Sequence, residues 1–569
     1  MTEKKINNLT ETSDATGRLQ HLFDQAHDAY QNGNYEAAIN FLNEVIAGDP
    51  LSGDAFNYRG LVKNAMGLYQ DAISDYTVAI GFFPEFDSAY INRGIACFNA
   101  QQNQQAIDDF TRAVQLNQTN ALPYSYLGIL YADMGNYEES IKNLTRTIKL
   151  EPAFALHYFR RAYYYDLMGK KQEALFDYNE TIRLDAANAD ACYNRGLIYQ
   201  FWERYQEAIT DYSKAIELNP NYSSAYYNRG KAHSKLKNFT DAITDLKKTI
   251  ELKPDYTNAK LELGVVYDAM GEYETAIIWY NEVLVTEPGA IDAHFNRGLA
   301  YFSCWKYTEA INDFKWVTEK NPQDDEAFFY MGASCYNLLM YDDALKNYNK
   351  AIAIYKENAT YFLERARAYN TLKQYSNAIN DLNETLKLKD QFAEAYLLRG
   401  IALYYTGELN AALEDFNNAI RIDPDYYDAF IERGYCYNKM KKPAEAITDL
   451  KKAYTLFPTN YLSLVDNIEI NFINGKKEDA AGYLTEANKL QWTPEQTIIF
   501  TFFNWLFKKA DRLNAEQEKN MLTRQLENYK GIEYNFSEIR EWLNESSFDI
   551  DVKEEIIAII DVLDAVNKK

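Results

Sequence analysis

A 34-residue unit repeats along this chain, and this period constrains the fold more than any other feature. Residues 189–222 have the sequence ADACYNRGLIYQFWERYQEAITDYSKAIELNPNY, and residues 223–256 have the sequence SSAYYNRGKAHSKLKNFTDAITDLKKTIELKPDY. Each copy has the spacing of two amphipathic helices joined by a turn. A fixed period of this length predicts a solenoid, in which every unit packs only on its neighbours.

The unit keeps its frame over most of the chain. With Ala189 as position 1, residues 19–460 divide into thirteen units without insertion or deletion. Position 8 is Gly or Ala in all thirteen units, position 20 is Ala in twelve, and position 32 is Pro in nine. Because proline cannot continue a helix, position 32 marks the end of each second helix.

These positions resemble the tetratricopeptide repeat family. The match is Gly or Ala at 8, often Tyr at 11, Ala at 20, Phe or Tyr at 24, Ala at 27 in several units and Pro at 32. The triplet Asn194-Arg195-Gly196, followed by Ala-Ile-Thr-Asp-Tyr, is similar to the pattern of long superhelical members. The resemblance covers about three quarters of the chain. It implies an all-α, right-handed superhelical solenoid of helix-turn-helix repeats.

The repeat divides the chain into four segments. Residues 1–18 are polar and are expected to be flexible. Residues 19–460 hold the thirteen units, and residues 461–494 form a degenerate fourteenth with Ile468 at position 8. Residues 495–569 leave the repeat and predict three or four helices, either a cap on the open end of the solenoid or a docking region.

Two stretches of the non-repeating end indicate where its helices lie. Residues 498–507 are strongly apolar and too long for a strand, so they predict a buried helix. Asp551 and Glu554 have the spacing of a capping box, which predicts a final helix from Glu554 to about Val566.

The composition favours some partners over others. The formal net charge is −24, and nucleic acid is excluded as a direct partner because phosphate binding needs a basic stripe. A basic protein or peptide is electrostatically favoured. The five cysteines show no CxxC spacing, and the first ten residues contain no apolar run. With no stretch long and apolar enough for a membrane span, we expect a cytoplasmic protein with free thiols.

Sequence motifs of catalysis are absent. The chain has no GxGxxG, GxxxxGK[ST], HExxH or GxSxG, and its five histidines lack metal-ligand spacing. Asp549 and Asp551 are similar to part of a calcium loop, but the glycine that the loop requires is missing. We therefore expect neither an enzyme nor a cofactor or metal site.

A charged pair recurs within the repeat. Position 7 is Arg in nine units, on the apolar face of the first helix, and the same nine units have Asp at position 23. Units without the Arg also lack the Asp, as Leu127 with Asn143 shows. Because a buried charge needs a partner, we predict a structural ion pair within each unit. The predicted pairs include Arg195–Asp211, Arg229–Asp245 and Arg297–Asp313.

The opposite face of the first helix is the candidate binding surface. It carries positions 2, 6, 9 and 13, with position 5 at its edge, and we call it the groove face. In the related family this face lines a channel that binds peptides, and Asn at position 6 holds extended backbone. The alternative is that neighbouring first helices bury these side chains against each other. The candidate residues are Asn92, Asn194, Asn228, Asn296, Tyr58, Tyr126, Tyr193, Tyr227, Phe295, Phe329 and Tyr330.

The predicted function is a non-catalytic scaffold or adaptor that binds a protein or peptide along the groove face. The alternative is a peptide-responsive regulatory sensor that relays a change through the C-terminal helices. The family's clamp for acidic C-termini needs Lys and Asn at set positions of three consecutive units, and no three units match it. The sequence carries no indication of an oligomeric state.

Overall fold

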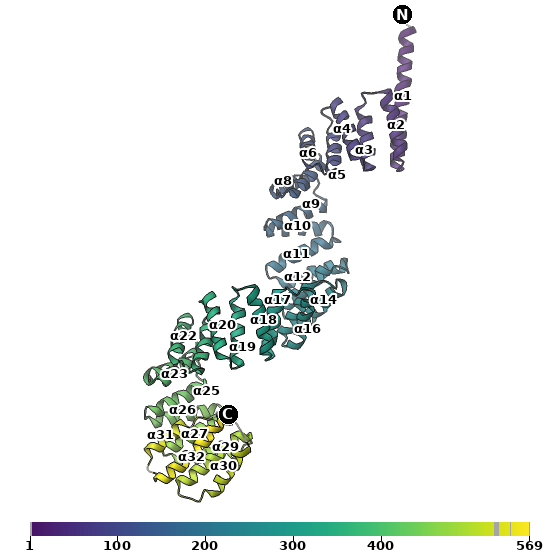
Figure 1. The fold of residues 1–569 in the computed structure, drawn as a ribbon. Coiled ribbons are helices and arrows are strands. Elements are labelled where there is room, and N and C mark those ends of the chain that lie inside the picture. Colours follow the sequence, from purple (N-terminus) through teal and green to yellow (C-terminus); the bar gives the residue numbers. More distant parts are fainter. Residues whose placement is uncertain (1–2, 529–533, 547, 568–569) are drawn as a thin grey trace. The chain divides into compact units, whose positions relative to one another are not determined.

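The computed structural model describes residues 3–528, 534–546 and 548–567, with side chains described over residues 17–526, 534–546 and 548–565. Every regular element in these ranges is an α-helix, from α1 to α32 (Figure 1). The chain divides into two compact parts, an N-terminal body (Met1–Gly271) and a C-terminal body (Glu272–Lys569). The predicted all-α repeat fold is confirmed.

The N-terminal body consists of helices that alternate as first and second helix of successive units. They are α1 (Glu3–Gln31), α2 (Tyr35–Gly48), α3 (Gly53–Ala65), α4 (Tyr69–Phe82), α5 (Asp87–Asn99), α6 (Asn103–Leu116), α7 (Ala121–Asp133), α8 (Tyr137–Leu150), α9 (Ala155–Leu167), α10 (Lys171–Leu184), α11 (Ala189–Phe201), α12 (Tyr205–Leu218), α13 (Ser223–Lys235), α14 (Phe239–Leu252) and α15 (Thr257–Ala269). Residues 1–2 and the side chains of residues 3–16 lie outside the described part, so the flexible segment expected for residues 1–18 stays a prediction.

The C-terminal body continues the repeat and then leaves it. Its repeat helices are α16 (Tyr273–Thr286), α17 (Ile291–Ser303), α18 (Tyr307–Lys320), α19 (Asp325–Asn337), α20 (Tyr341–Ile354), α21 (Ala359–Thr371), α22 (Tyr375–Leu388), α23 (Ala393–Thr406), α24 (Leu409–Ile422), α25 (Tyr427–Lys439), α26 (Pro443–Leu456), α27 (Tyr461–Ile473) and α28 (Lys477–Ala487). Four further helices follow, α29 (Pro494–Ala510), α30 (Glu516–Asn528), α31 (Ser537–Glu545) and α32 (Ile550–Asn567).

The turn between the two helices of a unit has one fixed backbone feature. Position 15 is left-handed, with positive φ, in all fourteen units. Glycine fills it in some units, but Trp305 and Leu339 adopt it with φ of 61° in others. A left-handed residue of this kind costs about 1–2 kcal/mol, so the packing of the helix pair must stabilise the turn.

The two helices of each unit approach closely because small residues lie between them. A Cβ added at Gly196 would lie 2.7 Å from the Tyr212 ring, so position 8 leaves room for the ring at position 24. The alanines at position 20, such as Ala208, are fully buried. The 34-residue pattern is therefore a packing pattern, repeated in both bodies.

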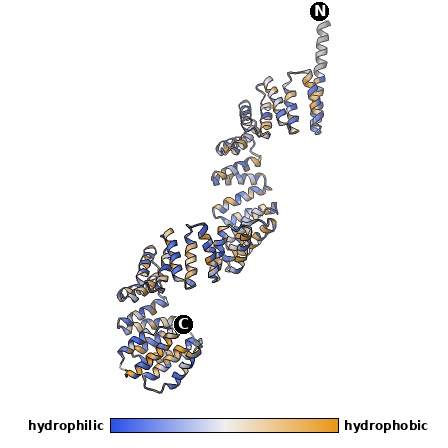
Figure 2. Cartoon of the chain, viewed as in Figure 1, coloured by the Kyte–Doolittle hydropathy of each residue, from blue (hydrophilic) through white to orange (hydrophobic). Residues whose placement is uncertain are grey.

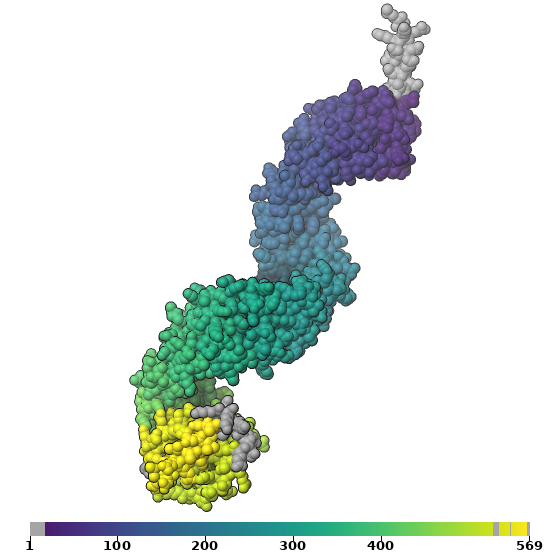
Figure 3. All heavy atoms as spheres, viewed as in Figure 1, coloured from purple at the N-terminus to yellow at the C-terminus, as the bar shows by residue number. Residues whose placement is uncertain are grey.

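The last helices share one hydrophobic core with the fourteenth unit. Leu464 and Ile468 of α27 are fully buried together with Phe503 and Trp505 of α29 and Ile560 of α32. Figure 2 shows hydrophobic residues gathered in these C-terminal helices, and in Figure 3 they lie directly against the last repeats. The apolar segment 498–507 lies within α29, where most of its side chains are buried.

The ends of two C-terminal helices differ from the sequence pattern. The final helix, α32, begins at Ile550 and not at Glu554, because the Asp549 carbonyl already accepts from the amides of Val552 and Lys553. Asp551 then lies in the first turn, where a carboxylate is favoured by the helix dipole. The predicted capping box is therefore wrong at this position.

A capping box occurs instead at the start of α29. The Thr493 hydroxyl accepts from the Gln496 amide, and the Gln496 side chain accepts from the Thr493 amide. Pro494 is the first residue of this helix, where its missing N–H has no helical partner to lose. No described helix combines the length and the apolar character needed to cross a membrane.

Candidate partner-binding surface

The Arg and Asp of the repeat lie in two-pronged contact within each unit. Arg195 donates from Nε to Oδ2 of Asp211 at 2.7 Å and from Nη2 to Oδ1 at 2.6 Å. The Asp211 side chain is only 5% exposed, and its hydrogen bonds raise the pKa of Arg195. The same geometry occurs in Arg59–Asp75, Arg93–Asp109, Arg161–Asp177, Arg229–Asp245, Arg297–Asp313, Arg365–Asp381, Arg399–Asp415 and Arg433–Asp449.

Each of these arginines also contacts the preceding unit, which the sequence analysis missed. Arg195 donates from Nη1 to Oδ1 of Asn179, at position 25 of that unit, at 2.7 Å. In the unit before each of the nine arginines, position 25 is Asn, Ser or Thr. Of the four other units with a preceding unit, three are preceded by Lys at position 25 (Lys247, Lys315 and Lys451) and one by Thr111. This covariation could have revealed the contact. Each guanidinium therefore donates from all three of its nitrogens to groups of the protein itself, as expected of a structural residue.

The aromatic candidates on the groove face pack between consecutive units. The Tyr126 ring stacks on Phe110 of the preceding unit, with centroids 5.0 Å apart, and Tyr330 stacks on Phe314 at 5.8 Å. Phe295 contacts Phe314 of its own unit, edge to face, so Phe314 lies between candidates of two units. The three rings are half-buried. Tyr126 and Tyr330 contact the second helix of the preceding unit, and they also contact its first helix through Phe98 and Phe302, as the alternative of coverage by a neighbouring first helix expects.

The other aromatic candidates combine packing with hydrogen bonds. Tyr58 shares a hydrogen bond of 2.9 Å with His27 Nδ1. Tyr193 packs against Tyr222, with ring centroids 4.9 Å apart. Tyr227 packs against Tyr256 and the ammonium of Lys231, and Phe329 packs against Tyr348 and Tyr361.

The asparagine candidates are half-buried amides with different surroundings. Asn92 donates to Oδ1 of Asn57 at 3.0 Å, and Asn194 lies beside the hydroxyl of Tyr178. Asn228 donates to the Tyr193 hydroxyl at 2.9 Å and to the Ser224 carbonyl at 3.1 Å. Asn296 makes no hydrogen bond to any described residue.

In the C-terminal body the groove face becomes acidic. Positions 2 and 6 of the first helices from α19 to α27 carry a series of carboxylates, which the sequence analysis did not single out. Arg367 forms ion pairs with Glu364 and Glu394, two of these residues. The series is Glu326, Glu364, Glu394, Asp428, Glu432 and Asp466. The loss of Asn and Tyr at position 6 after Tyr330 could have indicated this change.

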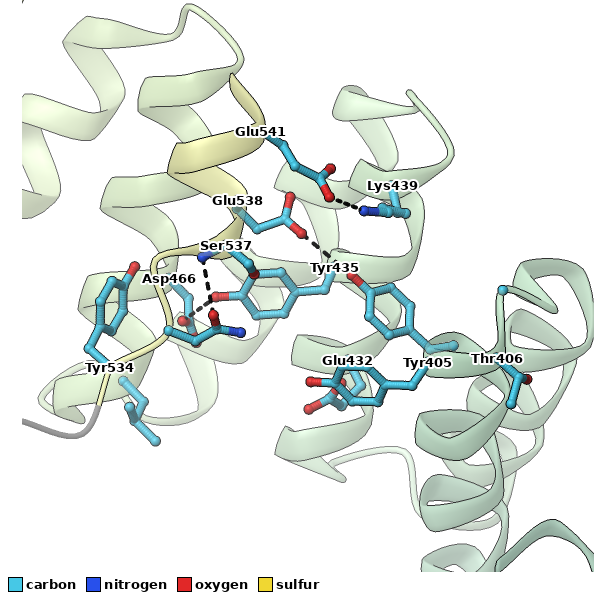
Figure 4. A pocket seen from close by; sticks show the side chains of 14 residues that line it. Tyr405, Thr406, Glu432, Tyr435, Lys439, Asp466, Tyr534, Ser537, Glu538 and Glu541 are labelled. Carbon is cyan, nitrogen blue, oxygen red and sulfur yellow. Dashed lines mark hydrogen bonds and ion pairs between the residues drawn. The ribbon is translucent and has the colours of Figure 1, made fainter. Parts of the chain in front are cut away.

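A cavity of about 790 Å³ opens where this acidic surface meets the C-terminal segment (Figure 4). It is lined by α23, α25 and α27 on one side and by residues 534–541 on the other. Tyr435 donates to Oδ1 of Asp466 at 2.6 Å across its floor. The carboxylates of Glu432 and Glu538 and the ring of Tyr405 also line it.

The carboxylates around this cavity titrate abnormally. Burial, followed by the nearby charges of Asp466 and Asp428, raises the pKa of Glu432 to about 7. Burial also raises the pKa of Asp466 to about 7, against the opposing effect of the Tyr435 hydrogen bond. Glu469, the neighbouring carboxylate of α27, is 1% exposed, and burial holds its pKa well above the usual range.

Helix α31 is held on the edge of the groove face by its acidic side chains. Glu538 accepts a hydrogen bond of 2.7 Å from Asn438 and one of 3.4 Å from Tyr404. Lys439 pairs with Glu541, and Lys441 pairs with Glu545 at 2.8 Å. The non-repeating end therefore does more than cover the last unit, because it also contacts the first helices of the two units before it.

The described residues show no metal site, since they contain no group of three His, Cys, Asp or Glu side chains that could hold an ion. The five cysteines are unpaired.

Several family models match the sequence. Tetratricopeptide repeat models match residues 189–222, 223–256 and 393–426, residues 23–85 and 127–191, and residues 427–460. A model of the anaphase-promoting complex, cyclosome, subunit 3, matches residues 269–351.

Solved structures are also similar to the chain. MamA is 26% identical over 29% of this chain and 96% of its own, with a TM-score of 0.28. Yeast Tom70 is 16% identical over 71% and 96%, with a TM-score of 0.32. The structure of Naa15/Naa10 bound to HypK-THB is 14% identical over 95% and 99%, with a TM-score of 0.33.

Proposed function

This chain is a tetratricopeptide repeat protein, and we propose that it is a non-catalytic scaffold or adaptor that holds an extended segment of a partner protein along the groove face. Repeats of this family indicate a protein-interaction scaffold. The thirteen units of residues 19–460 would supply the binding surface, the fourteenth unit would end it, and residues 495–569 would cap it.

The observation that supports this proposal best is the state of the groove-face amides. The Oδ1 atoms of Asn92, Asn228 and Asn296 accept no hydrogen bond from any described residue, although these side chains are half-buried. An amide can both donate to and accept from a peptide bond, so each of these side chains suits contact with an extended backbone. Backbone contacts give affinity with little choice of sequence, and several partners could share the surface.

The charge of the molecule favours a basic partner segment. The net charge is −24, and the groove face of the C-terminal body adds a concentrated row of carboxylates. Opposite charges raise the rate of encounter, and this effect declines as salt screens it. We further propose a cytoplasmic location, since five cysteines without a disulfide suit a reducing compartment.

A triple replacement of Asn194, Asn228 and Asn296 by Ala tests the proposal. Partners are captured from the native host with the full chain and quantified by mass spectrometry. We expect the triple variant to lose affinity by several kcal/mol at most, at about 1 kcal/mol for each neutral hydrogen bond, with nearly unchanged melting. Full retention of the partners by a stable triple variant would remove the binding site from this face.

A matched control separates binding from folding. Asn377→Ala removes an exposed amide of α22, a second helix, and leaves the whole groove face in place. The control should keep its partners. A triple variant that melts much earlier than both the wild type and this control would show that the asparagines are structural.

The contact of α31 with the groove face supports a second candidate, a sensor that responds to a bound peptide. A ligand near α25 would compete with Glu538 and Glu541 for Asn438 and Lys439. The sensor predicts that hydrogen exchange in α31 rises when the partner identified above is added. Unchanged exchange in α31 at saturating partner would argue against it.

A further inference from the structure

The cavity between α23, α25, α27 and residues 534–541 has the chemistry of a site for one positively charged group. We propose that it takes the guanidinium side chain of an arginine in the partner's segment. This inference rests on the proposed scaffold function and names the side chain that the partner presents.

The lining carries more negative charge than it can neutralise by itself. Four carboxylates line the cavity with one ammonium group, that of Lys439. Lys439 already pairs with Glu541, and Glu538 already accepts from Asn438 and Tyr404. Glu432 and Asp466 are left without a cation.

These two carboxylates have unused hydrogen-bonding capacity. Asp466 is only 6% exposed, and it uses one oxygen for Tyr435, while its other oxygen has no partner among the described residues. Glu432 makes no hydrogen bond or ion pair to any described residue, and the nearest charges that act on it, Asp428 and Asp466, are negative. Burying such groups is unfavourable unless a proton or a cation joins them.

The walls favour a planar cation over a compact one. The rings of Tyr404, Tyr405, Tyr435 and Tyr534 line the cavity beside the carboxylates. A guanidinium can stack on an aromatic face and donate two parallel hydrogen bonds to a carboxylate, whereas an ammonium is a strongly hydrated point charge. The volume of about 790 Å³ accommodates an arginine side chain with part of its peptide backbone.

Three capped peptides of the form acetyl-Gly-Ser-X-Ser-Gly-amide test the assignment, with arginine, lysine or citrulline as X. Citrulline keeps the shape of arginine without its charge. Binding to the full chain is measured by calorimetry at low salt and pH 8. We expect the citrulline peptide to bind about tenfold or more weakly than the arginine peptide, with lysine between them. Equal binding of the arginine and citrulline peptides would overturn the proposal.

A charge-neutral variant locates the site. Glu432→Gln should weaken the arginine peptide about tenfold or more, whereas Glu319→Gln, which removes an exposed carboxylate of the same body, should not. Because Glu432 has no partner to lose, its variant should melt no earlier than the wild type. Unchanged arginine binding by a folded Glu432→Gln chain would overturn the site. Asp466→Asn, which can still accept from Tyr435, gives a second test with the same expected loss.

The pH dependence is a further readout. Arginine stays charged, while Glu432 and Asp466 lose protons near neutrality, so the affinity should rise from pH 6 to pH 8. Constant affinity over this range would contradict their role. Several charged and titratable groups face the two carboxylates. They are Tyr404 and Tyr405 on α23, Tyr427, Asp428, Tyr435, Cys436 and Lys439 on α25, Tyr461 and Glu469 on α27, and Tyr534, Glu538 and Glu541 on the C-terminal segment.

The two proposals can fail separately. Asn194, Asn228 and Asn296 do not line the cavity, so their triple replacement should leave binding of the arginine peptide intact. If that variant also keeps every partner, the extended-backbone proposal fails and the cavity result is unaffected. If Glu432→Gln keeps both the arginine peptide and the partners, the arginine site fails and the scaffold proposal is unaffected.

Discussion

Two kinds of buried carboxylate occur in this protein. Asp211 and its equivalents at position 23 each face an arginine of the same unit, which holds both carboxylate oxygens. Glu432, Asp466 and Glu469, in the last units of the C-terminal body, face tyrosine hydroxyls and one another, with no arginine at hydrogen-bond distance among the described residues. Asp466 and Glu469 are buried like the carboxylates of the first kind and Glu432 is half-buried, but only the first kind has its charge neutralised by a cation.

This difference distinguishes the carboxylates that stabilise the fold from those that could bind a ligand. A carboxylate whose partner is supplied by its own unit is satisfied and has no reason to bind anything else. A buried carboxylate without a cation retains a proton or attracts a ligand, and perturbed pKa values of this kind concentrate at functional sites. In this protein the candidate site therefore lies where carboxylates are shielded without the arginine that the repeating pair supplies.

The largest expected effect comes from deleting residues 495–569, which supply part of the burial around the second kind of carboxylate. The deletion would expose Leu464, Ile468 and Phe472, which are at most 2% exposed in the intact chain. Because a solenoid needs a cap for solubility, we expect aggregation, measured by size-exclusion chromatography with light scattering. If exposure is the cause, polar replacements at these positions should restore solubility. A soluble, monomeric truncation with unchanged melting would show that the region is an appendage.

The next effect concerns the first kind of carboxylate. Asp245→Ala leaves the half-buried Arg229 guanidinium without its carboxylate partner, which should cost at most about 3–5 kcal/mol of local stability. Hydrogen exchange in α13 and α14 measures this loss.

The double variant Arg229→Leu with Asp245→Asn is the matched control, because it copies Leu127 and Asn143 of a natural unit. It should be much milder than the single variant. A double variant as unstable as the sum of both single variants would contradict the coupling of the pair.

The smallest expected effect is a pH dependence of the stability, caused by the second kind of carboxylate. The pKa of Glu432 and of Asp466 is about 7 in the folded chain, above the ordinary values near 4. The folded state thus binds more protons than the unfolded state between about pH 4 and 7, so stability falls as pH rises through this window. We expect the α25–α27 region to lose about 1–3 kcal/mol for each group between pH 5 and pH 8.

Hydrogen exchange in α25 and α27 at the two pH values measures this change. Glu432→Gln cannot titrate and should reduce the dependence, while Glu319→Gln should leave it unchanged. An unaltered pH dependence in the Glu432→Gln chain would show that this carboxyl is not the responsible group.

Periodicity predicted most of the fold and the ion pairs. The 34-residue frame placed the helices, and the joint presence of Arg and Asp predicted pairs such as Arg195–Asp211 before any distance was known. It predicted less for the contacts between units. The joint presence of Arg at position 7 and Asp at position 23 concerns one unit, so it does not indicate Asn179 of the preceding unit as the third partner of Arg195.

The groove face shows how far a pattern can specify a site. Helical spacing put Tyr126, Asn228 and Asn296 on one face, because side-chain direction follows from the helix period. Spacing does not say how much of each side chain a neighbouring unit covers. Only the packed structure shows Tyr126 stacked on Phe110 while the Asn228 oxygen stays unpaired.

The sequence by itself determined a repeating helical protein with paired charges, since both depend on contacts at fixed spacings that recur in every unit. The tertiary structure alone decided the cavity. Tyr404, Asp466 and Glu538 come from a repeat, a degenerate repeat and the non-repeating end, and no period relates them. They meet because α29 and α32 bury their apolar side chains on α27 and because the charges of α31 pair with α25. A site formed by contacts that occur only once in the chain cannot be predicted from the repeat period.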